Sequence, residues 1–259
     1  MGFYKTEAIV LRTREWREAD QLVTLLSPDL GRFKVVARGA RKPRSRLRGG
    51  IQPFTQARLM LHTGRSLDIL TGSDTCKCFY FREDLEKLTW AVYWADLLNR
   101  LLPEKEPNPA VYSLFLQFLY LLESIESINK ERIESQILNH LFELKLISLV
   151  GYRPELTHCV KCQKALSLTS EQIWFSPARG GTVCRLCFQA LGSGVLPVSS
   201  GTLALLKHWL RMDAQQFRRV RPSESNLKEL ERLLPGFLEY HLEQGLPSRK
   251  LVRNLVDKE

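Results

Sequence analysis

Residues 20–50 read DQLVTLLSPDLGRFKVVARGARKPRSRLRGG, and this stretch joins a strand pattern to a strongly basic segment. Two apolar runs are separated by a short connection that contains Pro28, Asp29 and Gly31. Such a combination between two apolar runs is typical of a hairpin loop. The stretch therefore predicts a β-hairpin that is followed directly by a segment rich in cationic side chains.

Strand patterns continue on both sides of this hairpin. Residues 5–16 alternate in a way that suits a strand with one well-buried face, and residues 54–74 give two further apolar runs about Thr63 and Gly64. Five short strands without a helix pattern favour a small closed β-barrel, and the OB-fold is the leading candidate. The basic segment then lies in or beside the loop that follows the third strand.

The hydrophobic period becomes helical after residue 80. One of these segments is apolar nearly all round, which is typical of a central, buried helix. The helices on either side of residues 158–190 are expected to pack together, with that module inserted between them. The predicted helices lie within residues 82–103, 110–125 (the apolar one), 130–152, 199–213 and 223–245.

The inserted module contains two Cys-x-x-Cys pairs, with 21 residues between the second and third cysteines. Two such pairs flanking a hairpin are typical of a closed tetrahedral zinc site that stabilises a fold and leaves no position open for water. An empty site and redox activity are the alternatives, and the neighbouring His158 is an alternative ligand. Cys76 and Cys78 are interpreted as ordinary strand residues. The predicted zinc ligands are Cys159, Cys162, Cys184 and Cys187.

The positive charge of the chain is concentrated. The net charge is +10, and residues 32–48 carry eight cationic and no acidic side chains, which leaves 10 − 8 = +2 for the rest. A local basic patch favours a polyanionic partner, although a merely solubilising loop is the alternative. Phosphate contacts predict salt-sensitive binding with weak sequence specificity. The predicted DNA-binding residues are Lys34, Arg38, Arg41, Lys42, Arg44, Arg46 and Arg48.

Residues 37–50 contain no aromatic side chain. Any stacking on bases must therefore come from the predicted barrel. The candidates are Phe3, Tyr4, Trp16, Phe33 and Phe54.

The sequence contains no recognisable catalytic motif and no membrane-spanning segment. There is no phosphate-binding GxxxxGK[ST] loop, no GxSxG and no HExxH, and the His-x-Glu at residues 241–243 lacks the later PCxxC of zinc deaminases. No stretch is apolar enough to span a bilayer, and the N-terminus lacks a signal peptide. We therefore predict a non-enzymatic, cytoplasmic protein without disulfides.

Two segments together resemble a known family. Residues 4–45, YKTEAIVLRTREWREADQLVTLLSPDLGRFKVVARGARKPRS, and the CVKC…FSPARGGTVCRLC element of residues 159–187 are similar to the RecO recombination mediators of bacteria. The resemblance implies an α+β protein: an OB-fold over residues 1–80, a helical domain over residues 81–259, and a four-cysteine zinc ribbon inserted at residues 156–192.

The resemblance also implies a function in DNA repair. Family members bind single- and double-stranded DNA, anneal complementary strands, and work with RecR to replace single-strand-binding protein by RecA. The expected partners are DNA, RecR, the C-terminal tail of single-strand-binding protein and RecA-coated DNA, at the nucleoid. No motif in this sequence locates the site for that tail. Two rival functions are an RNA-binding zinc-ribbon protein of translation or ribosome assembly, and a metal-dependent nuclease.

Overall fold

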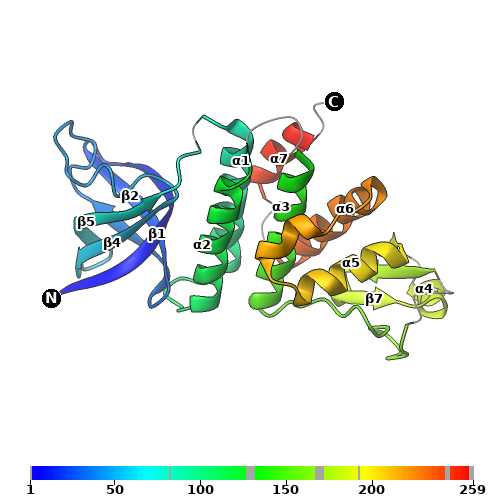
Figure 1. Ribbon diagram of the computed structural model, residues 1–259. Helices are drawn as coiled ribbons and strands as arrows, with labels where there is room; N and C mark the ends of the chain where they lie inside the picture. Colours follow the sequence, from blue (N-terminus) through cyan, green and yellow to red (C-terminus); the bar gives the residue numbers. More distant parts are fainter. Residues whose placement is uncertain are drawn as a thin grey trace. The chain divides into compact units, whose positions relative to one another are not determined.

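The computed structural model describes residues 2–81, 83–126, 132–166, 172–191, 193–242 and 246–256. The chain forms two compact units (Figure 1). The first unit comprises Met1–Ser124 together with Leu246–Glu259, and the second comprises Ile125–Gly245. Within the described ranges, no helix has the length and apolar character needed to cross a membrane.

The first unit begins with the predicted β-barrel. The strands close into a ring in the order β1-β2-β3-β5-β4, and β4 pairs back onto β1. All pairs are antiparallel except β3 with β5. This arrangement confirms the α+β fold with an OB-like barrel at its N-terminus. The strands are β1 (Phe3–Trp16), β2 (Asp20–Ser27), β3 (Gly31–Ala37), β4 (Thr55–His62) and β5 (Asp68–Cys78).

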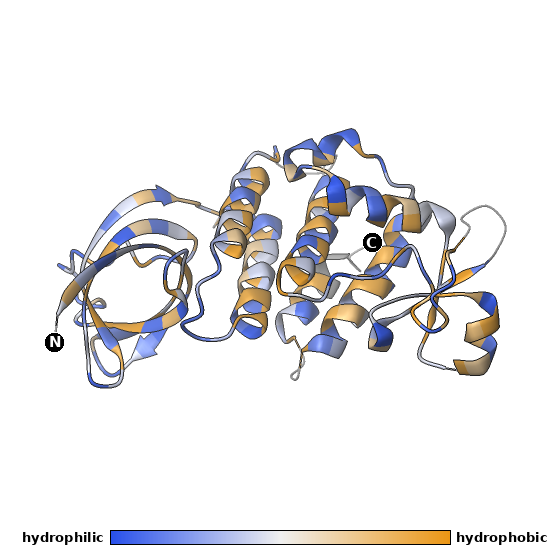
Figure 2. Cartoon of the chain, turned by 90° about the horizontal axis from the view of Figure 1, so that it is seen from below, coloured by the Kyte–Doolittle hydropathy of each residue, from blue (hydrophilic) through white to orange (hydrophobic). Residues whose placement is uncertain are grey.

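Strand β1 serves two neighbours because it is long. Residues 3–9 pair with β4, and residues 9–16 pair with β2 with a register shift between Val10 and Arg12. Alternate side chains of the strands fill the barrel, as expected for a pleated sheet closed on itself. Figure 2 shows hydrophobic and hydrophilic residues alternating along the barrel strands.

Three helices complete the first unit: α1 (Leu85–Leu101), α2 (Pro109–Glu123) and α7 (Ser248–Val256). The side chains of Asp84 and Asn108 cap α1 and α2 by accepting backbone N–H groups of the first turn. Helix α7 packs against α1, and the Ser248 hydroxyl donates a hydrogen bond of 2.6 Å to Asp96. The end of the chain thus returns to the unit in which the chain begins.

A buried arginine joins the barrel to α1. Arg32, on β3, donates from Nε to the backbone oxygen of Leu102 at 2.9 Å, and from Nη1 to Asn99 and Glu104, each at 3.2 Å. Its side chain is only 10% exposed. A buried guanidinium needs such acceptors, because an unpaired buried charge is strongly destabilising. Arg32 therefore belongs to the core of the first unit and not to the solvent-exposed basic segment in which the sequence places it.

The second unit is helical, with the cysteine module inserted. Helix α3 (Arg132–Leu149) packs against α5, η2 and α6, so the helices before and after the module do pack together. Residues 130, 131 and 243–245 of the predicted helices lie outside the described residues. The remaining elements are β6 (Ile173–Ser176), η1 (Pro177–Arg179), β7 (Gly181–Val183), α4 (Arg185–Leu191), β8 (Leu196–Val198), α5 (Ser200–Arg211), η2 (Ala214–Arg219) and α6 (Glu224–His241).

Two glycines with the same backbone conformation allow a test of how the barrel packs against the connection between α1 and α2. Gly31 (φ +67°) lies against the backbone of Glu106, and a Cβ at Gly31 would overlap the carbonyl oxygen of Glu106. At Gly39 (φ +62°) the nearest atom to an added Cβ is Cδ of Lys42, at 3.7 Å. We expect Gly39→Ala to lower the free energy of unfolding by about 1–2 kcal/mol, the cost of a left-handed alanine. Gly31→Ala should lose about 1–3 kcal/mol more, because packed backbone must shift. Urea denaturation of both variants checks this, and equal losses would contradict the described packing.

Candidate nucleic-acid interface and metal site

The basic segment forms the connection between β3 and β4, residues 38–54, which we call the basic loop. It folds as consecutive turns: the N–H of Lys42 donates to the oxygen of Gly39 at 3.1 Å, and the N–H of Ser45 donates to the oxygen of Lys42 at 3.0 Å. The loop follows the third strand, as the sequence predicts. Repeated turns separate successive side chains in direction and prevent them from lining one helix face.

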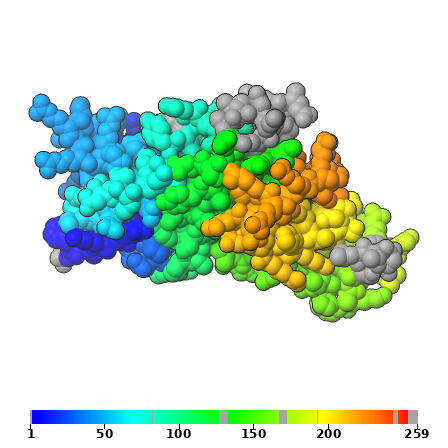
Figure 3. Space-filling view, viewed as in Figure 1, coloured from blue at the N-terminus to red at the C-terminus, as the bar shows by residue number. Residues whose placement is uncertain are grey.

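Apolar side chains hold the basic loop on the barrel. Ala40 and Ile51 are buried in the barrel core, and Leu47 packs against it from the loop. The side chains between these anchors turn outward, and in Figure 3 the light-blue atoms of this region project from the surface. The exposed cations are Arg38, Arg41, Lys42, Arg44, Arg46 and Arg48.

Arg41 fastens the loop to the hairpin between β1 and β2. Its backbone N–H donates to the oxygen of Ala19 at 3.0 Å. Its guanidinium lies 3.0 Å from a carboxylate oxygen of Glu15 and donates to the backbone oxygen of Glu18 at 3.1 Å. The guanidinium of Arg41 thus already has partners within the protein, and these contacts position the loop.

Lys34 also has an acidic partner. Its ammonium lies 2.5 Å from Glu104, and this hydrogen bond holds the pKa of the Glu104 carboxyl below its usual range. The structure therefore divides the seven predicted DNA-binding residues into two groups. Lys34 and Arg41 form ion pairs, whereas the other five form none with any residue in the described part of the chain. Those five are Arg38, Lys42, Arg44, Arg46 and Arg48.

Two further arginines, not among the predicted DNA-binding residues, lie on the neighbouring strand β1. Arg12 and Arg14 are exposed on the second half of β1, and the same alternation brings Trp16 to that face. In register, Arg12 lies opposite Thr24, and Thr24 lies opposite Lys34, so one row crosses β1, β2 and β3. Period-two spacing of arginines in a predicted strand was the signal that could have identified them.

The structure sorts the aromatic candidates by exposure. Phe33 and Phe54 are buried, and the hydroxyl of the half-buried Tyr4 is hydrogen-bonded within the barrel. Phe3 is 68% exposed, and Trp16 is half-buried. Phe3 therefore has the most exposed ring, and Trp16, unlike Tyr4, is not packed against the barrel core.

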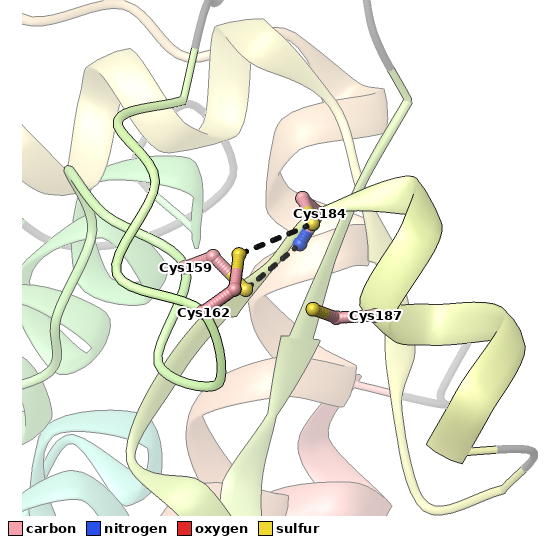
Figure 4. Close-up of side chains that lie close together, drawn as sticks. All are labelled: Cys159, Cys162, Cys184 and Cys187. Carbon is pink, nitrogen blue, oxygen red and sulfur yellow. Dashed lines mark hydrogen bonds between the residues drawn. The ribbon is translucent and has the colours of Figure 1, made fainter.

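The four module cysteines form one cluster, with all sulfur atoms within 4.8 Å of one another (Figure 4). The sulfurs of Cys162 and Cys184 are 3.8 Å apart, and the N–H of Cys184 donates to the sulfur of Cys159 at 3.4 Å. Four sulfurs about 2.3 Å from a tetrahedral metal ion lie about 3.8 Å apart. The donor set and its spacing therefore fit a tetrahedral thiolate-bound metal ion.

Local structure explains why these cysteines meet. The first pair lies in a tight turn, where Gln163 has φ +62° and its N–H donates to the oxygen of Cys159 at 2.8 Å. The second pair follows the β6–β7 hairpin, which turns at Gly180 (φ +70°), and its last member lies on α4. Burial raises the pKa of the Cys159 thiol, but hydrogen bonds from the backbone N–H groups around it outweigh this and lower the pKa to about 6.

Neighbouring residues stand outside this cluster. Nδ1 of His158 lies 2.9 Å from the Thr157 hydroxyl and 3.8 Å from Glu155. Cys76 and Cys78 lie on β5, in the other unit. The ligand atoms that gather in the described part of the chain are thus those of the two Cys-x-x-Cys pairs.

Comparison with known proteins covers nearly the whole chain. Residues 1–79 match the family described as Recombination protein O N terminal, and residues 82–250 match Recombination protein O C terminal. The proteins named DNA repair protein RecO from Pelotomaculum thermopropionicum and Symbiobacterium thermophilum are 39% and 34% identical, covering 96% and 98% of this chain and 93% and 98% of their own. The one from Roseiflexus sp. is 38% identical over 93% of this chain and 82% of its own. These matches favour DNA repair over the RNA-binding alternative, and the chain belongs to the RecO family of DNA repair and recombination proteins.

Proposed function

We propose that this protein is a non-enzymatic recombination mediator that binds single- and double-stranded DNA at the basic loop and anneals complementary strands. The observation that supports this most directly is the set of five exposed cations without acidic partners in the described structure, at Arg38, Lys42, Arg44, Arg46 and Arg48. Both forms of DNA present the same phosphates, so a surface that recognises phosphate binds both.

Charge neutralisation is sufficient for annealing. Two complementary strands repel each other through their phosphates, and cationic side chains lower this repulsion when they replace condensed counterions. Base pairing then proceeds without nucleotide hydrolysis. Because the contacts are to phosphates, we expect the affinity to depend little on DNA sequence. The same contacts bind the single strands and the duplex product, so the protein is not held more tightly by the product.

The partners follow from family membership. We propose that the protein works with RecR to replace single-strand-binding protein by RecA. It contacts the C-terminal tail of single-strand-binding protein in this process. It acts at the nucleoid and also on RecA-coated DNA. The support is the match of both family domains along the chain.

We also propose that the cysteine cluster holds a structural Zn²⁺ through Cys159, Cys162, Cys184 and Cys187. Support comes from the four-sulfur donor set and its spacing. Zinc bound in this way supplies a cross-link that stabilises folding and leaves no ligand position open. The ion would hold the turn at residues 159–164 against β7 and α4.

Replacing four loop cations tests the DNA site. The combined variant Lys42→Ala, Arg44→Ala, Arg46→Ala and Arg48→Ala should weaken binding to all DNA sequences and reduce the dependence of log K on log[salt]. Each lost phosphate contact should lower that slope by about 0.7–0.9. Fluorescence anisotropy with labelled single strands and duplexes, at several salt concentrations, measures both quantities.

A charge-matched control lies in the second unit. Replacing Lys161, Lys164, Arg179 and Arg185 by alanine removes the same formal charge from exposed positions that do not belong to the basic loop. The proposal requires a smaller effect on the slope from this control. If the loop variant keeps its affinity and its salt slope while it remains folded, the DNA site is wrong.

Annealing on coated strands tests the mediator role. We expect the protein to accelerate annealing of complementary strands coated with single-strand-binding protein, and to do so less well when that protein lacks its acidic tail. Gel analysis of duplex formation over time, with and without RecR, provides the measurement. If the protein does not make bare complementary strands anneal faster than they do spontaneously, the proposed annealing activity is refuted.

The metal proposal predicts loss of zinc from Cys184→Ser. One ligand fewer opens the site, so zinc content should fall and the melting temperature should drop, because metal binding contributes to folding. The matched control is Cys76→Ser, which changes an exposed cysteine on β5 outside the cluster. Elemental analysis and thermal unfolding provide the readouts. Normal zinc content and full stability of the Cys184 variant would reject the structural role.

A further inference from the structure

Trp16 is a half-buried aromatic side chain on the β1–β2 hairpin, to which the first turn of the basic loop is hydrogen-bonded. It is the last residue of β1, and its partner in register across the hairpin is Asp20. A carboxylate oxygen of Asp20 accepts the N–H of Gly39 at 2.8 Å, and the oxygen of Ala19 accepts the N–H of Arg41 at 3.0 Å. The first turn of the basic loop is thus fastened to the same hairpin that presents Trp16.

A cation accompanies the indole ring. The guanidinium carbon of Arg14 lies 5.8 Å from the centre of the Trp16 ring, which is within the range of a cation–π contact. Arg14 is exposed and the ring is half-buried, so part of the ring remains accessible to solvent. The hairpin therefore offers an aromatic surface with positive charge next to it. Arginine beside an aromatic ring is suited to a base and its adjoining phosphate.

Phe3, the other accessible ring among the five sequence candidates, is too far from the first turn of the basic loop for this role. Phe3 is more exposed than Trp16, but it stands at the opposite end of the 14-residue strand β1, where it packs edge-on against His62. That separation is about 40 Å along the strand. A nucleotide whose phosphate contacts the first turn of the basic loop is next to Trp16 and not to Phe3.

We propose that Trp16 stacks on a base of the strand whose phosphates the basic loop holds, and that this makes the surface bind single strands more tightly than duplexes. The inference rests on the proposed DNA-binding function. Phosphates are available in both single strands and duplexes, whereas the bases of a duplex are already paired and stacked. A stacking residue therefore adds affinity for single strands alone. One stacked base contributes about 5- to 150-fold in affinity.

Trp16→Ala separates stacking from phosphate contact. The probes are an oligothymidine, a duplex of equal length, and an abasic sugar-phosphate strand of equal length, all measured by anisotropy at several salt concentrations. Trp16→Ala should weaken oligothymidine binding about 5- to 150-fold. Binding of the duplex and of the abasic strand should change less than about twofold, with the salt slope unchanged. Trp16→Phe should restore much of the loss, and Phe3→Ala should affect none of the probes.

Each contrary result has a definite meaning. Equal losses for all three probes would show that Trp16 only supports the loop, and an unchanged oligothymidine affinity would show that no base stacks on it. Either result overturns the inference, as does a larger single-strand loss from Phe3→Ala. The proposed function is judged separately, by the salt slope of the four-residue loop variant. If that slope falls as expected while Trp16→Ala has no effect, only the stacking inference fails.

Discussion

The burial of Ala40 and Ile51 in the barrel, with the partly buried Leu47 packed against them, determines where the cations of the basic loop can lie. Fully burying a leucine or isoleucine side chain contributes about 1.5–3 kcal/mol. Two unit charges about 4 Å apart in water repel by about 1 kcal/mol, and salt screens this further. Apolar anchoring therefore prevails over mutual repulsion, and the loop keeps its cations assembled before any polyanion arrives. Binding then requires less ordering of the loop than an unanchored segment would need.

Arg32 and Lys34 lie on the same face of β3, yet their surroundings differ. Arg32 is covered by the end of α1 and donates to Leu102, 70 positions along the chain, while Lys34 remains half-buried beside Glu104. In the sequence, Arg32 and Lys34 belong to the same cluster of cationic residues. Their separate environments depend on which helix end reaches the strand, and local patterns carry no information on that contact. The ion pair between Arg41 and Glu15 was hidden for the same reason.

Patterns with a strong local cause were predicted well. Alternation and turn residues identified the barrel strands, and the Cys-x-x-Cys spacing identified the residues that cluster in the ribbon. Strand β8, with three residues, was missed because so short a segment has no measurable alternation, although it completes the ribbon sheet beside β6. The exposure of Trp16 relative to Phe33 and Phe54 was equally out of reach, since all three are aromatic residues in or next to strands.

The return of Leu246–Glu259 to the first unit has a consequence for biosynthesis. A ribosome releases the barrel, α1 and α2 early, but the segment that packs on α1 emerges only after the whole second unit has been made. The OB-like barrel can form early, whereas the contact between Ser248 and Asp96 must wait until the second unit has been synthesised. The first unit to begin folding is therefore completed only after the second, and a nascent chain that stalls before Leu246 emerges would carry a complete ribbon while α1 still lacks α7.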